Sequence, residues 1–161
     1  MKKLDFHTQI TIFDSKEELP EAILSLMKEA EAAREKAYAP YSNFRVGAAI
    51  LLDNGKIITG NNQENAAYPS GLCAERVAIY FAGAQFPQAK MLQLVVTARS
   101  EKQVLKTPIP PCGSCRQAIA EYEIKQNQPI GIYFMGETGQ VYKTDSIKDL
   151  LPLLFDSSSL K

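Results

Sequence analysis

Hydrophobic and polar residues follow two periods along the chain, one helical and one extended. Between residues 15 and 38, apolar positions such as Leu19, Ile23 and Leu26 lie three or four residues apart with Glu and Lys between them, which predicts an amphipathic helix. Compact apolar runs between turn residues, such as Leu-Gln-Leu-Val-Val-Thr-Ala at 92–98, predict buried strands. We expect strands at 46–52, 56–60, 92–98, 129–135 and 140–143, and helices at 15–38, 73–84, 112–125 and 146–151.

The order of these elements indicates the fold class. Asp53-Asn54-Gly55 separates the first two strands and predicts an antiparallel hairpin, after which helices and strands alternate. This order predicts an α/β domain with one mixed sheet of roughly five strands and helices on both faces. We place this single domain at residues 15–161. Residues 1–14 form an N-terminal arm, which is either an extra edge strand or a loose segment.

Composition and charge exclude several classes of partner. Eighteen Lys and Arg residues balance eighteen Asp and Glu residues, whereas chains that bind nucleic-acid backbones usually carry a basic excess. We therefore expect no nucleic-acid partner. No apolar run approaches the roughly 18 residues that span a bilayer, so we expect no membrane association. The N-terminus lacks the apolar stretch of a secretory signal, which favours a cytoplasmic protein.

The three cysteines point to a metal. An odd number fits poorly with a disulfide framework. Alone, the Cys-x-x-Cys pair of Cys112 and Cys115 is compatible with half of a structural zinc site, a redox pair or chance. Cys73 opens the other predicted helix, while the single histidine, His7, lies far away in the arm and is interpreted as a solvated residue. Three protein ligands with an open fourth position are typical of a catalytic zinc, where water is acidified.

Charged residues next to the cysteines fit this interpretation. The first turn of a helix favours a thiolate, because its N–H groups and positive dipole end are free. Arg76 follows Cys73 by three residues and Arg116 follows Cys115 directly, so both supply counter-charge, and Arg76 is a candidate for a hydrogen bond to a ligating sulfur. Glu75 lies in the same turn as Cys73. This position suits a general acid and base that is not itself a ligand.

These residues resemble a known family. Cys-Ala-Glu-Arg at 73–76 with Pro-Cys-Gly-Ser-Cys at 111–115 resembles the zinc deaminases. Ala-Pro-Tyr-Ser-Asn-Phe at 39–44 and Asn-Gln-Glu-Asn-Ala at 62–66 resemble the small, tetrameric cytidine deaminases, and the similarity extends over about 19–155. The resemblance implies a three-layer α/β/α sandwich and one zinc per chain. It also implies the hydrolytic deamination of cytidine and deoxycytidine to uridine and deoxyuridine.

The resemblance assigns roles in substrate binding within one chain. It implies that Asn62 and Glu64 bind the 3′-hydroxyl of the sugar, for which an amide and a carboxylate offer a donor and an acceptor together. It implies that Phe44 packs in the nucleoside pocket. The backbone N–H of Ala74 is expected to contact the carbonyl of the pyrimidine.

Other roles implied by the resemblance cross between subunits. Ala66 and Tyr68 are expected to reach a neighbour's site near the 5′-hydroxyl, and Phe155 to stack on the base bound in an adjacent subunit. Both expectations imply a homotetramer with shared active sites. Two residues depart from the family's pattern: Gln63 stands where an apolar residue is usual, and Pro110 where serine is common. These departures concern the shape of the pocket and leave the chemistry in place.

Four other functions remain as alternatives. A nucleotide deaminase needs cations for the phosphate, whereas Glu64 brings a carboxylate near the sugar. An antibiotic deaminase has no use for the Asn-x-Glu-Asn stretch at 62–65. A non-catalytic zinc module requires neither Glu75 nor an open ligand position. A polynucleotide editor is disfavoured by the balanced charge.

Overall fold

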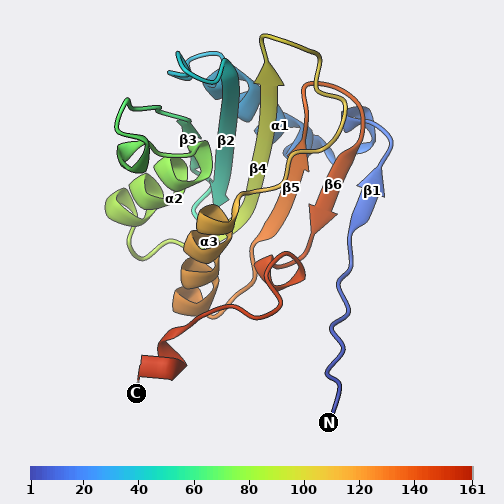
Figure 1. Cartoon of the computed structure of the whole chain (residues 1–161), viewed down its shortest axis with the longest axis vertical. Coiled ribbons are helices and arrows are strands. Elements are labelled where there is room, and N and C mark those ends of the chain that lie inside the picture. The colour runs from blue at the N-terminus through green and yellow to red at the C-terminus, as the bar shows by residue number, and fades with distance from the viewer. Residues whose placement is uncertain (161) are drawn as a thin grey trace.

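A six-stranded mixed sheet forms the centre of the molecule (Figure 1). The structure is a computed structural model and describes residues 1–160. The strand order is β1-β6-β5-β4-β2-β3, in which β4 and β5 are parallel and all other neighbours are antiparallel. The strands are β1 (Thr11–Phe13), β2 (Phe44–Leu52), β3 (Ile57–Asn61), β4 (Met91–Ser100), β5 (Gly131–Met135) and β6 (Val141–Thr144).

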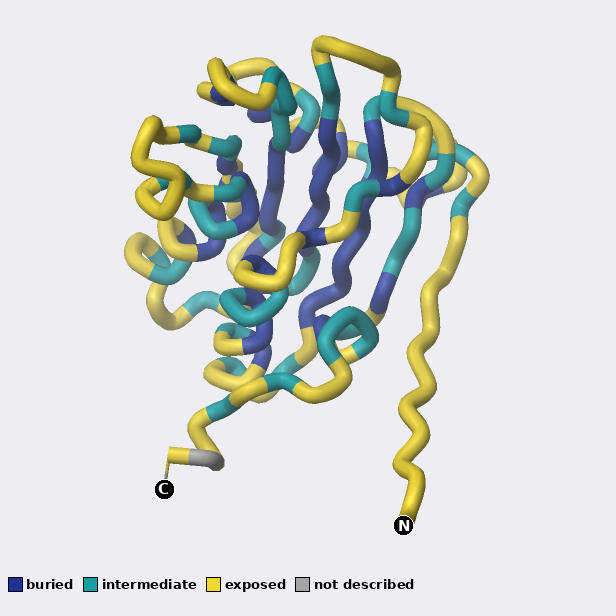
Figure 2. The backbone as a smooth tube through the Cα atoms, in the orientation of Figure 1, coloured by how far each residue is buried: buried dark blue, intermediate teal, exposed yellow. Residues whose placement is uncertain are grey.

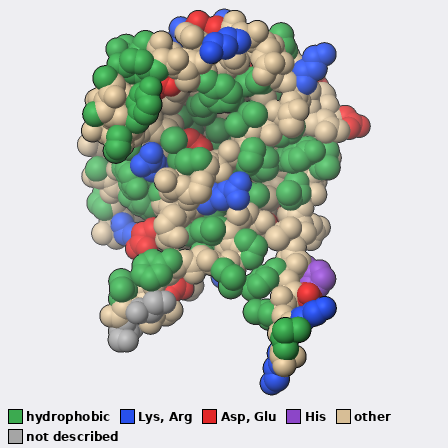
Figure 3. Space-filling view, viewed as in Figure 1, with side chains coloured by type: hydrophobic (Ala, Val, Ile, Leu, Met, Phe, Trp, Pro, Cys, Tyr) green, Lys and Arg blue, Asp and Glu red, His purple; other side chains and the backbone are tan. Residues whose placement is uncertain are grey.

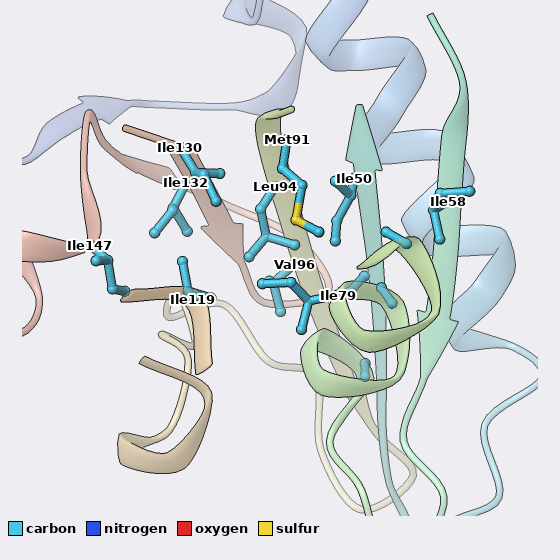
Figure 4. Packing of buried hydrophobic residues seen from close by; sticks show 14 of the residues in the cluster. Ile50, Ile58, Ile79, Met91, Leu94, Val96, Ile119, Ile130, Ile132 and Ile147 are labelled. Carbon is cyan, nitrogen blue, oxygen red and sulfur yellow. The ribbon is translucent and has the colours of Figure 1, made fainter. Parts of the chain in front are cut away.

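Helices cover both faces of the sheet. Helix α1 (Glu21–Arg34) lies on one face, and α2 (Ala74–Gln85) and α3 (Gly113–Gln126) lie on the other (Figure 1). Each face has its own apolar core, seen as dark blue segments in Figure 2. Ile79 of α2 and Ile119 of α3 point toward the sheet in the larger core (Figure 4). Among the described residues, no helix has the length and apolarity needed to cross a membrane.

The three-layer α/β/α sandwich expected from the sequence is confirmed, with one strand more than expected. The extra strand is β1, which pairs antiparallel with β6 and brings three residues of the N-terminal arm into the sheet. Of the two forms considered for the arm, residues 11–13 thus adopt the edge strand. The last expected helix is a single 3-10 turn at Ile147–Asp149, and the first helix is shorter than expected because it begins after Pro20.

A glycine on β3 determines how closely α2 approaches the sheet. A Cβ atom at Gly60 would lie 2.5 Å from the carbonyl oxygen of Ala74 and 2.6 Å from the backbone nitrogen of Ala78. Any larger residue would therefore push the first turn of α2 away from the strand. Because Cys73 immediately precedes that turn, the contact at Gly60 fixes the position of one thiol of the site.

Candidate active site

Two helix starts bring the three cysteines together. Cys73 and Cys112 are the N-cap residues of α2 and α3, both with extended backbone, and Cys115 is buried in the first turn of α3. The Sγ atoms of Cys73 and Cys112 lie 3.9 Å apart, and those of Cys112 and Cys115 lie 3.5 Å apart. All three sulfur atoms lie within 4.8 Å of one another.

This spacing fits a tetrahedral zinc ion. Sulfur atoms that each lie about 2.3 Å from zinc at tetrahedral angles are about 3.8 Å apart. The Cys73–Cys112 and Cys112–Cys115 sulfur separations of 3.9 Å and 3.5 Å lie close to that value. Three thiol ligands leave a fourth position for water or substrate. The cluster has the composition and size of a catalytic zinc site.

The neighbours of Cys73 make its thiol more acidic than that of Cys115. A hydrogen bond from Cys115, followed by the guanidinium of Arg76, lowers the pKa of Cys73 to about 5 although burial opposes the shift. Nη2 of Arg76 lies 3.8 Å from Cys73 Sγ, which agrees with the contact considered from the sequence. The hydrogen bond to the Cys73 thiolate and burial raise the pKa of Cys115. Cys73 therefore loses its proton before Cys115 does.

Glu75 lies beside the thiols in a buried position. It is the second residue of α2 and is 5% exposed. Burial raises the pKa of Glu75, and the charge of Cys73 raises it further. A carboxyl group with a raised pKa can both accept and donate a proton near neutral pH. Glu75 thus has the surroundings of a general acid and base.

A single cavity joins the thiols to the polar loop that follows β3. Its volume is about 610 Å³, large enough for a nucleoside-sized ligand. Figure 3 shows a hollow on this face, in the upper half of the view, with hydrophobic side chains around it. Cys73, Cys112 and Glu75 line the part of the cavity that we call the inner part. The other lining residues are Tyr41, Ser42, Phe44, Val46, Asn62, Gln63, Glu64, Asn65, Tyr68, Gly71, Leu72, Arg76, Val96, Ile109 and Pro110.

Comparison with known proteins gives the same result for sequence and for structure. A family model described as the cytidine and deoxycytidylate deaminase zinc-binding region matches residues 20–128. This chain belongs to that family. The cytidine deaminase of Halalkalibacterium halodurans is 38% identical over 135 residues, which are 84% of this chain and 95% of the relative. The cytidine deaminase of Sporosarcina psychrophila is 39% identical over 135 residues, 84% of this chain and 92% of that protein.

A solved structure shares the fold over its full length. The crystal structure of cytidine deaminase from Burkholderia pseudomallei has a TM-score of 0.71 and 38% identity, and the match covers 85% of this chain and 100% of that one. The matched family region of this deaminase contains all three cysteines and Glu75. Zinc is therefore the metal that the family and the thiol cluster both indicate.

The polar loop of the deaminase is fixed by hydrogen bonds to its own backbone. Oδ1 of Asn62 accepts from Val46 N at 2.7 Å, and its Nδ2 donates to the Phe44 carbonyl at 2.9 Å. One amide N–H and one lone pair of Asn62 remain for a ligand. Sequence reasoning treated Asn62 as a sugar-binding group alone, whereas here it also joins β2 to the loop.

Glu64 is positioned by a turn that sequence reasoning did not include among the site residues. Its Oε2 accepts from the backbone N–H groups of Tyr41 at 2.9 Å and Ser42 at 3.2 Å, and its Oε1 accepts from the Ser42 hydroxyl. Burial raises the pKa of Glu64, but these hydrogen bonds outweigh it, and the pKa is lowered overall. Glu64 is thus held as a carboxylate at neutral pH. The Ser42 hydroxyl also accepts from Phe44 N, an i to i+2 contact that a Ser-Asn turn could have suggested.

The remaining candidates lie outside the inner part of the cavity. Tyr68 lies at its rim, 76% exposed, with its ring 6.2 Å from that of Tyr41. Ala66 and Phe155 do not line the cavity within one chain, and Phe155 is 57% exposed. Ala74 is fully buried, but as the first residue of α2 its N–H has no partner within the helix.

Arg116 has a different role from the counter-charge considered from the sequence. Its Nε donates to the Pro111 carbonyl and its Nη1 to the Leu150 carbonyl, each at 2.8 Å. Arg116 therefore fixes the residue before Cys112 and joins it to the C-terminal segment. The counter-charge at the thiols comes from Arg76, whose Nε is buried without a hydrogen-bond partner among the described residues. An unpaired buried donor beside the thiols is consistent with a site that holds a further group.

Proposed function

We propose that the protein hydrolyses cytidine and deoxycytidine to uridine and deoxyuridine with release of ammonia. The observation that carries the proposal is the buried carboxyl group of Glu75, which lines one cavity with Cys73 and Cys112, two of the three clustered thiols. Cys73, Cys112 and Cys115 would hold one zinc ion. The relatives named cytidine deaminase support the substrate class.

Glu75 moves the protons of the reaction. Zinc in the thiol cluster supplies Lewis acidity, which lowers the pKa of a water molecule enough to make it a nucleophile at neutral pH. Glu75 accepts a proton from that water as its oxygen attacks the ring carbon that bears the amine. The carboxyl group then protonates the adjacent ring nitrogen. It next accepts the remaining proton of the added hydroxyl and passes it to the amine, so that ammonia leaves as the C–N bond breaks and the ring carbonyl forms. The raised pKa of Glu75 suits both directions of transfer.

The rest of the cavity orients the nucleoside. The free N–H of Asn62 and the carboxylate of Glu64 would bind the 3′-hydroxyl, because together they offer a donor and an acceptor. The N–H of Ala74 would bind the carbonyl of the pyrimidine, and Phe44 would pack against the nucleoside. A phosphate at the sugar would meet the negative charge of Glu64, so the nucleoside is favoured over its nucleotide.

The working enzyme is a homotetramer in this proposal. Ala66 and Phe155 are exposed and lie away from their own cavity, and Tyr68 is largely exposed at its rim. A neighbouring subunit would use Ala66 and Tyr68 near the 5′-hydroxyl and Phe155 against the base, which would close the site to water. We assign the enzyme to the cytoplasm, where three thiols stay reduced.

One assay tests the substrate class. Ammonia release is measured from cytidine, deoxycytidine, free cytosine and cytidine 5′-monophosphate with the zinc-loaded protein. We expect the two nucleosides to be turned over, and cytosine and the monophosphate to be poor substrates. Faster turnover of cytosine or of the monophosphate would contradict the proposal. Glu75→Gln, which keeps the fold and the thiols, controls for a contaminating deaminase.

A further inference from the structure

The N-terminal arm is an extended segment outside the catalytic architecture. Residues 1–10 are all exposed and run away from the body of the molecule (Figures 1 and 2). The backbone N–H of Gln9 donates to Oδ1 of Asp149 at 3.2 Å, which keeps the end of the arm aligned with β1. The matched family region begins only at residue 20, so the family match assigns no role to the arm.

The arm has one apolar face. Leu4, Phe6, Ile10 and Ile12 are 77%, 47%, 40% and 52% exposed, and all four have even numbers. Side chains of alternate residues share a face in an extended chain. Phe13 packs on Tyr133 at the α1 face, so Ile12 lies on the opposite face of β1. If residues 4–10 continue this alternation when paired, Leu4, Phe6 and Ile10 share the face of Ile12. Four large apolar side chains on one face of an exposed extended segment indicate a surface that binds another protein.

The backbone of the arm is also available for pairing. Strand β1 is the edge of the sheet, with β6 on one side only. An apolar edge strand with free N–H and C=O groups is a template for another strand. The surface therefore requires an extended partner with an apolar face of its own.

We infer that this partner is the arm of a second copy of the chain, paired antiparallel about a two-fold axis at Thr8. In this register Leu4 faces Ile12 of the second copy and Phe6 faces Ile10, which gives four apolar cross-strand pairs in all. Lys2 faces Asp14, so opposite charges meet at both ends. The two surfaces are identical and self-complementary, as a two-fold interface requires.

Neighbouring registers fit less well. An axis at His7 keeps only the Leu4–Ile10 pairs and sets Lys2 against Ile12. An axis at Gln9 keeps only the Phe6–Ile12 pairs and sets Leu4 against Asp14. Each alternative halves the apolar pairs and loses the opposite charges. The sequence of the arm thus selects the axis at Thr8.

The paired arms are remote from the active site. β1 and β3 form opposite edges of the sheet, and the cavity is lined from β2, the loop after β3 and the starts of α2 and α3. Two molecules joined through their arms therefore keep their cavities unchanged. Pairing of the arms and the proposed deaminase activity can be measured independently.

Cysteine cross-linking tests the register. Thr8→Cys places two thiols opposite each other, with Cβ atoms about 5 Å apart. Leu4→Cys is the matched control, because its two copies lie eight residues apart along the ribbon, about 27 Å. The zinc-loaded variants and the unaltered chain are oxidised with glutathione disulfide and run on non-reducing gels. We expect at least tenfold more dimer for Thr8→Cys than for Leu4→Cys. Absence of the Thr8→Cys dimer, or equal yields, overturns the proposal.

A second pair of variants tests the apolar face within the Thr8→Cys chain. Phe6→Asp puts a carboxylate against Ile10 and should lower the dimer yield at least tenfold. His7→Asp adds the same charge on the opposite face and should leave the yield within about twofold. Equal yields from Phe6→Asp and His7→Asp overturn the proposal. Turnover per bound zinc should be the same in all these variants, so a loss of activity would concern the proposed function instead.

Discussion

The inner and outer parts of the cavity differ in what one chain supplies. The inner part, formed by Cys73, Cys112 and Glu75, is held by two helix starts packed against the sheet, and Glu75 is buried. The outer part includes Tyr68 and is mostly exposed. In the proposed mechanism one chain supplies the reacting groups, and a neighbouring chain completes the enclosure of the substrate. This difference would separate rate from affinity, because the inner residues would act on the reacting atoms and the outer ones only on binding.

Loss of the proton carrier should give the largest effect. We expect Glu75→Gln to lower kcat by about 100- to 10,000-fold, because the amide cannot accept the proton from water. The zinc content should stay at one per chain, since Glu75 is not a ligand. Steady-state kinetics with metal analysis checks both values. Turnover near that of the unaltered enzyme would mean that another group carries the proton.

Metal uptake by the inner part should depend strongly on pH. The pKa of Cys73 is lowered to about 5, so this thiol is already ionised at neutral pH, while the raised pKa of Cys115 keeps that thiol protonated. Zinc must displace at least the Cys115 proton, so the apparent affinity for zinc should rise at least about tenfold per pH unit between pH 6 and 8. This apparent affinity is measured at each pH by adding zinc to the zinc-free protein in competition with a chelator. A flat profile would contradict this assignment of the protons.

The contact with the sugar should have an intermediate effect. Glu64→Gln replaces a charged acceptor by a neutral one, and hydrogen bonds to charged groups contribute about 1.5–3 kcal/mol. We expect kcat/KM for cytidine to fall about 10- to 100-fold. The matched control is 3′-deoxycytidine, which lacks the hydroxyl and should be affected little by the substitution. An equal loss with both substrates would show that Glu64 acts through the Tyr41–Ser42 turn alone.

The outer part should give the smallest effect. Phe155→Ala should raise KM for cytidine about 2- to 12-fold with kcat nearly unchanged, because an aromatic pair contributes about 0.5–1.5 kcal/mol. Leu153→Ala, another exposed apolar residue of the same segment, is the control and should leave KM unchanged. Sedimentation should find the same assembly in all three proteins. A fully active monomer would contradict the shared site.

Local patterns were sufficient to place Cys73, Cys112 and Glu75 at two helix starts. Cys73, Cys112 and Glu75 lie at helix starts, and a helix start is readable from a few neighbouring residues. Contacts between distant segments were not readable in this way. The pairing of β1 with β6 joins residues about 130 positions apart, and Arg116 reaches the Leu150 carbonyl 34 residues away. Such contacts depend on how distant segments pack, and the local spacing of hydrophobic and polar residues does not reveal them.

The close approach at Gly60 limits how the specificity of this protein can be redesigned. Backbone meets backbone where α2 rests on β3, so no side chain is available there to trim or enlarge. Substitutions that add volume at Gly60 would displace Cys73 together with the helix that carries it. A laboratory selecting variants for bulkier bases should therefore leave this strand intact. Useful diversity lies in the exposed residues 65–70 and in the C-terminal segment, where side chains can change while the helix starts stay in place.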